Sequence, residues 1–363
     1  MRRRNVAIGF LSAIALLAAA CGSSDKPAAS DTTTPTTEKF EKDVVLMTHD
    51  SFAVSKPVLA AFEQQTGYDV KVLKSGDAGE AVSKAILTRE HPVADAFFGV
   101  DNTFLTKALD ADLFEPYTAK GLDGVRADLL DADPEHRVTP IDHANVCIND
   151  DRAWFGKDGR PAPPESLDDL VKPEYRNLLV VENPVSSSPG LAFLLATIAA
   201  YGDDGWQDYW QQLRDNGVRV VDGWEEAYYT DFTAGGGGGD RPLVVSYATD
   251  PAADVVFSDG KKQTPTVGVV DGTCFAQSEF AGVLANAGNA AGARALIDFM
   301  LTEKFQADIP LQMYVYPAVT GTPLPTVFRD FAPPPDESFS MTPEQIGENR
   351  RAWQDEWTDI VLR

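Results

Sequence analysis

Residues 43–102 decide the fold, and they read DVVLMTHDSFAVSKPVLAAFEQQTGYDVKVLKSGDAGEAVSKAILTREHPVADAFFGVDN. Short, largely apolar or alternating runs at 44–48, 68–73 and 94–100 predict strands. Apolar residues at helical spacing predict helices over 55–65 and 78–89, and Gly67 ends the first of them. This alternation of strands and helices predicts an α/β fold with a parallel, doubly wound sheet and helices on both faces.

The pattern changes near residue 138. Two extended segments, 138–142 and 144–148, follow each other without a helix, and 266–270 and 273–279 are extended again. Between these pairs, strands are predicted at 178–181, 218–221 and 243–247, with helices at 167–170, 189–201, 206–216 and 224–232. We expect residues 281–300, rich in Ala and Gly, to be mostly helical, and an amphipathic helix at 341–362.

The middle of the chain therefore resembles a second α/β unit inserted into the first. We expect one lobe to comprise 43–143 and 274–363, and the other to comprise 144–273, with two crossover strands joining the lobes. A cleft between such lobes is where ligands of open α/β sheets bind, at the carboxyl ends of the strands.

The first 20 residues have the features of an export signal. Three Arg follow Met1, and residues 6–20 are uncharged and apolar, which is too short a stretch to span a membrane comfortably. Small residues before Cys21 resemble a lipobox, which predicts lipidation of Cys21; an uncleaved anchor helix is the alternative. Residues 21–42 are rich in Ser, Thr and Pro and predict a disordered tether. We expect an exported protein, lipid-anchored on the outer face of the cytoplasmic membrane.

The charge of the chain narrows its partners. The 363 residues include 31 Lys and Arg against 55 Asp and Glu, a formal net charge of −24. Loss of the three Arg in residues 1–20 takes this charge to −27. Such a surface repels phosphate backbones, so nucleic acid is excluded as a partner. The electrostatic field of this negative charge favours a cationic ligand, and the same charge also keeps a protein soluble.

The sequence contains none of the common catalytic or metal-binding motifs. It has no G-x-S-x-G, H-E-x-x-H, C-x-x-C or P-loop pattern, and its four His have no metal-ligand spacing. We therefore expect a protein that is not an enzyme and that has no cofactor or metal. Cys147 and Cys274 remain as an even pair in an exported chain, each in a crossover segment, and we expect them to form a disulfide.

Aromatic and acidic residues recur where the predicted strands end. His49 and Asp50 follow the first strand, and Asp77 follows the second. The later strand ends carry Trp224, Tyr228, Tyr229, Tyr247, Thr249, Asp250, Tyr314 and Tyr316. An aromatic cage with carboxylates suits an organic cation, because ring faces and negative charges both attract it.

Several motifs in order resemble one known family. They are THDSF at 48–52, GVDN at 99–102, SSPG at 187–190, GWEEAY at 223–228, LVVSY at 243–247, IPLQMYVYP at 309–317 and RRAWQDEW at 350–357. They are similar to the thiamine-binding proteins of bacterial thiamine ABC importers, over residues 43–363. The resemblance implies a type II periplasmic-binding-protein fold and no catalysis. It also implies capture of thiamine or a thiamine phosphate outside the cytoplasm, delivery to an ABC permease, and a monomer.

The resemblance also implies a ligand site. Its members would be Asp77, Ala78, Ser187, Ser188, Trp224, Tyr247, Ala248, Thr249, Asp250 and Tyr314, and the strand-end argument adds His49, Asp50 and Tyr228. The chain departs from the family in several places. His49, and the stretch around His143, stand where a Tyr is common, Tyr314 stands where a Trp is usual, and Asp250 replaces a small hydroxyl residue.

Other functions fit the same fold. Ferric iron could be bound by adjacent Tyr228 and Tyr229 with Asp50 or His49, because iron prefers hard oxygen ligands. A polyamine would also favour acids and aromatics. A thiaminase-like enzyme would need a cysteine nucleophile, for which Cys147 and Cys274 are the candidates. The glycines at 235–239 predict a flexible loop, which we expect to be an inert surface insertion.

Overall fold

The computed structural model describes residues 41–363, so the predicted signal peptide, Cys21 and nearly all of the predicted tether lie outside the described residues. The first half of this part contains β1 (Asp43–Thr48), α1 (Lys56–Thr66), β2 (Asp69–Lys74), α2 (Ala78–Leu87), β3 (Ala96–Asp101), α3 (Leu105–Leu109), η1 (Leu122–Gly124), α4 (Ala127–Leu130), β4 (Thr139–Asp151), α5 (Arg152–Phe155), η2 (Leu167–Asp169), η3 (Pro173–Tyr175) and β5 (Leu179–Glu182). The second half contains α6 (Ser188–Tyr201), α7 (Trp206–Asp215), β6 (Arg219–Val221), the π-helix η4 (Glu226–Asp231), β7 (Leu243–Tyr247), α8 (Asp250–Val256), β8 (Val267–Val283), α9 (Ala290–Met300), α10 (Glu303–Gln306), α11 (Ile309–Gln312), β9 (Tyr316–Pro317), α12 (Thr326–Phe331) and α13 (Pro343–Val361).

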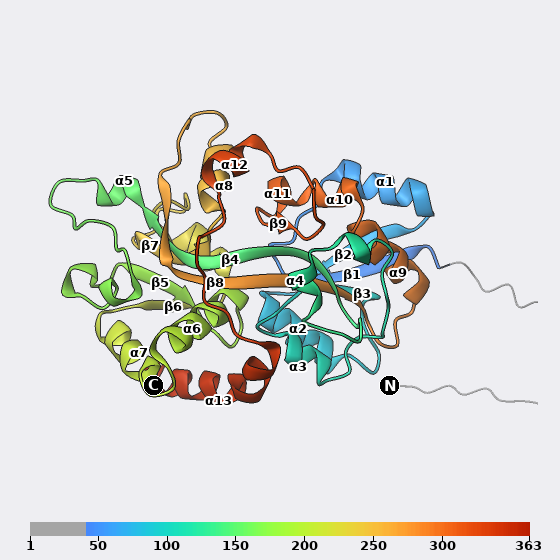
Figure 1. Cartoon of the computed structure of the whole chain (residues 1–363), viewed down its shortest axis with the longest axis horizontal. Helices are drawn as coiled ribbons and strands as arrows, with labels where there is room; N and C mark the ends of the chain where they lie inside the picture. Colours follow the sequence, from blue (N-terminus) through green and yellow to red (C-terminus); the bar gives the residue numbers. More distant parts are fainter. Residues whose placement is uncertain (1–40) are drawn as a thin grey trace, which may run out of the picture. The chain divides into compact units, whose positions relative to one another are not determined.

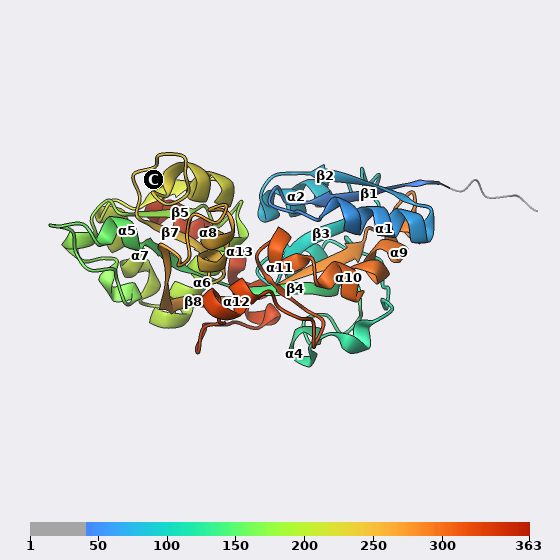
Figure 2. The same cartoon turned by 90° about the horizontal axis from the view of Figure 1, so that it is seen from above.

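Within residues 41–363 the strands form one continuous sheet in the order β2-β1-β3-β8-β4-β7-β5-β6, with β9 paired to β4. The outer strands are parallel: β1 pairs with β2 and β3, and β5 pairs with β6 and β7. The long strands β4 and β8 are antiparallel to each other, and β8 pairs with β3 while β4 pairs with β7. Figure 2 shows β1, β2 and β3 toward one end and β5 and β7 toward the other, with β4 and β8 between them. The predicted arrangement of two α/β units joined by two crossover strands is confirmed, whereas the residue boundaries of the lobes stay a prediction.

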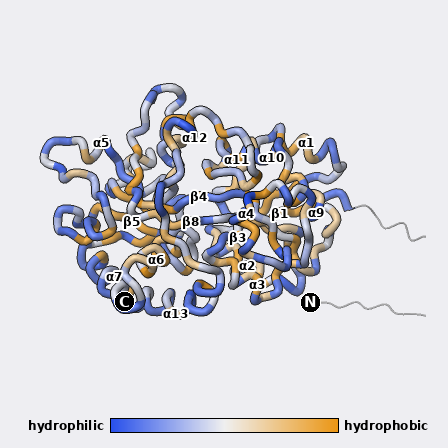
Figure 3. The backbone as a smooth tube through the Cα atoms, viewed as in Figure 1, coloured by the Kyte–Doolittle hydropathy of each residue, from blue (hydrophilic) through white to orange (hydrophobic). Residues whose placement is uncertain are grey.

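Helices cover both faces of the sheet, because its inner strands are buried on both sides. β3 is buried along its whole length, as expected of a central strand in a doubly wound sheet. Figure 1 shows α2, α3, α6, α7 and α13 below the sheet and α1, α8, α10, α11 and α12 above it. The most apolar of these helices is α6, which is buried from Ser188 to Ile198 and stands out in Figure 3. It can be apolar all round because it is enclosed on every side.

The C-terminal helix α13 touches elements from both units. Its start is fixed by a capping box between Thr342 and Gln345. Near its start, Gly347 lies against the Thr106 side chain of α3. Near its end, the ring of Trp357 meets Trp210 of α7 edge to face, with the ring centroids 5.4 Å apart. The helix therefore contributes to the core on the face that carries α2, α3, α6 and α7.

One predicted element is wrong in its extent. Residues 281–283 are the end of β8, and the helix α9 begins only at Ala290. The strand continues because Ala281 and Val283 are fully buried and pair with Phe98 and Ala96 of β3. Pairing and burial therefore override the helical preference of this Ala-rich segment.

Among the described residues, no helix combines the length and the apolar character that crossing a bilayer requires.

Candidate functional site

A cavity of about 260 Å³ lies where strands from both units end. His49 follows β1, Asp77 follows β2, Trp224 follows β6, and Tyr247 is the last residue of β7. Within each unit the parallel strands present their carboxyl ends at one edge, and residues at the strand ends of both units line this cavity, although the strands of the two units run in opposite directions in the sheet. Open α/β folds bind ligands at such strand ends. The sheet order thus brings together residues that are far apart in the sequence.

The lining is aromatic and acidic. The aromatic residues are Trp224, Tyr228, Tyr229, Tyr247, Phe257 and Tyr314, and the acidic ones are Asp50, Asp77, Glu80, Asp222, Glu225, Glu226, Asp250 and Glu279. His49 and a few small or apolar side chains complete the wall, and within residues 41–363 no Lys or Arg lines it. The cavity therefore offers ring faces and an excess of carboxylates, of which Glu80 is paired with Lys84 at 2.8 Å and Glu279 lies 3.4 Å from His49.

Trp224 is held in place from several sides. Its ring stacks on Tyr228 at a centroid distance of 5.1 Å and an interplanar angle of 25°. Tyr229 and Tyr247 meet the same ring edge to face, at 5.4 and 6.1 Å. The indole Nε1 donates a hydrogen bond of 2.8 Å to the buried Ser246 Oγ. This network fixes the orientation of the indole before any ligand arrives.

Asp77 connects the two sides of the cavity. Its carboxylate caps α2 by accepting from the Ala78 N–H at 2.6 Å, and it accepts from the Trp224 N–H at 2.8 Å. Burial raises the pKa of Asp77, although these hydrogen bonds and the Ser187 hydroxyl act to lower it. A carboxylate at a helix N-terminus is also favoured by the helix dipole.

Asp250 lies at the start of α8 and is buried. It accepts hydrogen bonds from Asn149 Nδ2 at 2.6 Å and from the Tyr247 N–H at 3.4 Å. Burial raises the pKa of Asp250 to about 7, against the opposing effect of its hydrogen bonds. Its charge therefore changes within the physiological pH range.

A chain of three titratable groups lies at the base of the cavity. His49 Nε2 is 3.4 Å from Glu279 Oε1, and Glu279 faces Asp142 across the β4–β8 ladder. Burial lowers the pKa of His49, but the charge and hydrogen bond of Glu279 outweigh this, so that the pKa is raised. Burial and the neighbouring Glu279 raise the pKa of Asp142 well above its usual range. The surroundings therefore favour the protonated form of Asp142 and the charged form of His49.

Two further acids lie deeper. Asp101 accepts from Gln277 Nε2 and Thr103 Oγ1, both at 2.8 Å, and burial raises its pKa to about 6. Glu182, at the end of β5, is completely buried, and burial raises its pKa well above the usual range. Nothing in the local sequence pattern marks these two residues, or Asp142 and Glu279, as members of a site.

The structure brings ten of the thirteen sequence-predicted site residues to the cavity wall: His49, Asp50, Asp77, Ala78, Ser188, Trp224, Tyr228, Tyr247, Asp250 and Tyr314. The other three lie behind it. Ser187 is buried near Asp77, and Ala248 packs against Cys147 and Cys274. Thr249 donates from its hydroxyl to the backbone carbonyl of Tyr314.

Tyr314 has an unusual backbone, with φ at 56°, a region that bulky residues rarely occupy. The hydrogen bond from Thr249 helps to hold this conformation, which directs attention to Tyr314 as a functional residue. Its ring lies 5.0 Å from Phe257, a residue that the sequence analysis missed although it is 64% exposed. Phe257 ends a short helix in which nothing in the local pattern distinguishes it.

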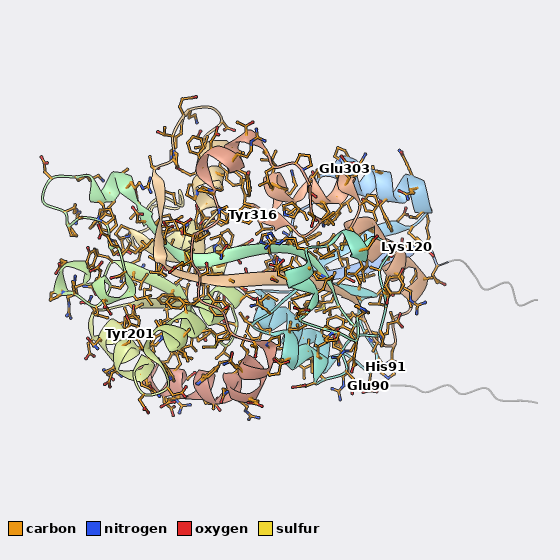
Figure 4. The ribbon with its side chains drawn as sticks, in the orientation of Figure 1. Glu90, His91, Lys120, Tyr201, Glu303 and Tyr316 are labelled. Carbon is orange, nitrogen blue, oxygen red and sulfur yellow. A yellow bond between two sulfur atoms is a disulfide. The ribbon has the colours of Figure 1, made fainter. Side chains whose placement is uncertain are left out.

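His143 is not part of the cavity lining. Its Nε2 lies 3.0 Å from Arg126 Nη1, and its ring stacks on Tyr316 at 5.2 Å. Figure 4 shows Tyr316 between β4 and α12, where its hydroxyl donates to the carbonyl of Ala332 at 2.6 Å. Burial and the adjacent Arg126 lower the pKa of His143 to about 4, so this ring packs as a neutral side chain.

The structure joins Cys147 and Cys274 by a disulfide across β4 and β8. Both cysteines are buried, and neither lines the cavity. Among the described residues there is also no cluster of three or more His, Cys, Asp or Glu side chains with the geometry of a metal site.

The fold and the cavity define a protein that encloses a small solute between two α/β units. The chain belongs to the bacterial extracellular solute-binding protein family, whose model matches residues 91–335. Members of this family bind solutes and are not enzymes.

Three relatives are close over most of the chain. The thiamine-binding periplasmic protein of Escherichia coli is 30% identical over 332 residues, which cover 89% of this chain and 95% of the relative. The thiamine-binding periplasmic protein of Brucella melitensis is 28% identical over 325 residues, 88% and 92% of the two chains. A solved structure of a periplasmic thiamin-binding protein superimposes with a TM-score of 0.75 at 26% identity, covering 88% of this chain and 96% of that one. The predicted periplasmic-binding-protein fold is thereby confirmed.

Proposed function

We propose that this protein captures thiamine outside the cytoplasm and delivers it to an ABC permease. The observation that carries the proposal is a cavity with six aromatic side chains and eight carboxylates in its wall and no Lys or Arg among its described lining residues. The names of the relatives at 28–30% identity support the same ligand.

The chemistry of thiamine matches this wall. Its thiazolium ring is a permanent cation, and its pyrimidine ring is a flat, polar aromatic group. Ring faces such as Trp224 attract a cation, by about 1–2 kcal/mol when the contact is largely shielded from water. Asp77 and Asp250 supply compensating charge close to the rings. We propose that the thirteen residues named above form this site, with Ser187, Ala248 and Thr249 supporting the others from behind.

Ferric iron is less well supported. Tyr228 and Tyr229 both line the cavity, with their rings edge to face at 5.4 Å. Iron would need them as phenolates, because a metal ligand must be deprotonated. Burial and the charges of Asp250 and Asp254 raise the pKa of Tyr228 well above its usual range. Burial and nearby acids also raise the pKa of Tyr229. An iron(III) ion would therefore have to displace both phenolic protons on binding, a cost that its own charge would have to offset.

A thiaminase-like reaction lacks its nucleophile. The only described cysteines, Cys147 and Cys274, are bonded to each other and lie outside the cavity wall. A polyamine would satisfy the carboxylates, but it would leave the stacked aromatic rings without a flat partner. Thiamine uses both features of the wall.

We also propose the remaining sequence-based assignments. Residues 1–20 would be a signal peptide, Cys21 the lipidated mature N-terminus, and residues 21–42 a tether that holds a monomer at the outer face of the cytoplasmic membrane. Mass spectrometry of the membrane fraction tests the anchor, because a diacylglyceryl group would appear on a peptide that begins at Cys21.

Titration calorimetry tests the ligand. The purified protein is titrated in parallel with thiamine, iron(III) citrate and spermidine. We expect saturable heat with thiamine alone. Heat with spermidine or iron and none with thiamine would contradict the proposal, and a charge-transfer colour on addition of iron would favour the iron alternative.

A further inference from the structure

The glycine run at residues 235–239 does not behave as an inert insertion. It follows the π-helix η4 (Glu226–Asp231), which carries Tyr228 and Tyr229 into the cavity. The chain turns back at once, since the Gly235 N–H donates to the Phe232 carbonyl at 3.1 Å and the Arg241 N–H donates to the Asp231 carbonyl at 3.0 Å. The glycine run therefore packs against η4, the helix that precedes it in the sequence.

Alternate glycines face this helix. A side chain on Gly235 would collide with the carbonyl of Tyr228, and one on Gly237 with the carbonyl of Tyr229. One on Gly239 would collide with the carbonyl of Asp231. In each case the Cβ would lie inside 3.0 Å of a backbone oxygen, a distance that real Cβ atoms essentially never show. The Cα–H groups of these glycines therefore point at backbone carbonyls of η4. Such Cα–H···O=C contacts are weak hydrogen bonds that recur where two backbones lie close together.

The two intervening glycines face away. Nothing lies within 4 Å of a Cβ built on Gly236 or Gly238, and both have positive φ, 89° and 82°. The alternation means that the run winds with one side against η4 and the other side open, and the positive φ of Gly236 and Gly238 turns the backbone between the contacts. Only glycine permits two backbones to approach so closely.

This packing lies directly behind the aromatic wall of the cavity, which we define as Trp224, Tyr228 and Tyr229. Tyr228 stacks on Trp224, and Tyr229 meets Trp224 edge to face at 5.4 Å. A π-helix turn is a sparsely used conformation that frequently marks functional sites. Its carbonyls at Tyr228 and Tyr229, which the run covers, belong to the same residues whose rings line the cavity.

We propose that Gly235, Gly237 and Gly239 are positioning residues, which set the place of Tyr228 and Tyr229 against Trp224 and thereby determine affinity for the ligand from outside the cavity. The effect on thiamine binding rests on the function proposed above. The effect on the aromatic wall does not depend on the identity of the ligand.

The test compares Gly237→Ala with Gly236→Asn in the full chain. The first places a methyl group against η4, whereas the second adds a larger side chain in open space, at a positive φ of 89° that strains any side chain but that Asn accommodates better than most residues. We expect Gly237→Ala to weaken thiamine binding about tenfold, comparable to the loss of one shielded cation–π contact. We expect Gly236→Asn to stay within about twofold of the original Kd.

A second background separates positioning from general damage. Gly237 packs against the Tyr229 carbonyl, so in a Tyr229→Ala protein, where only the Tyr228 ring remains, Gly237→Ala should weaken binding clearly less than it does in the original protein. Undiminished weakening in that background would overturn the proposal, and so would a Kd for Gly237→Ala equal to that of the original protein.

Near-ultraviolet circular dichroism gives a readout without ligand. Gly237→Ala should alter the aromatic signal while the far-ultraviolet spectrum is unchanged, and Gly236→Asn should alter neither. If the original protein binds no thiamine, the proposed function fails, and this spectrum still decides whether the run positions the rings. If Gly237→Ala does not fold, Gly239→Ala replaces it. Failure of both to fold, with Gly236→Asn folded, would overturn the proposal by showing that the run serves the fold rather than the wall.

Discussion

Replacement of Trp224 by alanine should weaken thiamine binding while the protein remains folded. The indole forms part of the cavity wall and is stacked on Tyr228 at 5.1 Å. Loss of a stacked contact with a shielded cation costs about 1–2 kcal/mol, which corresponds to a Kd roughly five- to thirtyfold higher. Part of the indole already packs against tyrosines, so the fold loses a contact as well, and stability must be measured beside affinity.

Trp224→Phe separates the two contributions of this side chain. Phenylalanine keeps a ring face for the ligand but removes the hydrogen bond from Nε1 to Ser246 Oγ. Its Kd should therefore lie between those of the original protein and Trp224→Ala. The matched control is Trp154→Ala, because Trp154 packs under Arg160 at 4.0 Å and does not line the cavity.

The assay is calorimetric titration with thiamine, combined with thermal unfolding of each variant. A Kd for Trp224→Ala equal to that of the original protein, with normal unfolding, would refute the reasoning and make Trp224 a packing residue. A loss of affinity in Trp154→Ala of the same size would refute it too, because the effect would not be specific to the cavity.

Other perturbations probe charge and covalent structure. Burial raises the pKa of Asp250 to about 7, so its carboxylate is neutralised as the pH falls through 7. Thiamine affinity, measured by titration at several pH values, should therefore fall between pH 8 and pH 6, and this fall should be smaller in Asp250→Asn. An affinity that does not change with pH would contradict this. The raised pKa also means that, between about pH 4 and pH 8, the folded protein holds a proton that the unfolded chain releases. Asp250 should therefore lower the free energy of unfolding as the pH rises through this range, and denaturant melts of Asp250→Asn should show a smaller decline in that free energy. Asp77→Asn should weaken thiamine binding, measured by titration, clearly more than Glu348→Gln on α13. Equal effects of the two substitutions would mean that the negative charge of the protein acts on the ligand only as a diffuse field. Mass spectrometry of the unreduced protein should find Cys147 and Cys274 in one pair of linked peptides, and two alkylatable thiols would contradict the disulfide. In the chain-entropy model this disulfide stabilises the folded protein by roughly 3–5 kcal/mol.

Much of the architecture could be predicted because local patterns and tertiary structure agree. The segment 43–102 alternates strand and helix, and each predicted element in it appears in the structure. Extended segments without an intervening helix predicted the long strands β4 and β8. The end of β8 could not be predicted, because the Ala-rich residues after Phe280 are held in the sheet by pairing with β3 rather than by their own preference.

The site was partly predictable for a related reason. Residues at strand ends, such as Asp77, Trp224 and Tyr247, line one cavity because the parallel strands of each unit end at it. Glu279 was missed because it lies inside β8, and it reaches the cavity only through the antiparallel register that places it beside Asp142. The raised pKa of Asp250 was equally inaccessible, because it results from burial that no local pattern specifies.

The glycine run shows the limit of composition as a guide. Five consecutive glycines at 235–239 predict flexibility, and the sequence contains nothing that identifies a packing partner. The partner is the backbone of η4, and the close approach is visible only when the positions of the carbonyls are known. Function in such a segment arises from the absence of side chains, which a search for chemical groups does not detect.

The most direct test of the central claim is a crystal structure of the protein grown with saturating thiamine. We expect ring density within the cavity, in contact with Trp224, with the thiazolium close to carboxylates that include Asp250. An empty cavity, or thiamine bound elsewhere on the protein, would contradict the account.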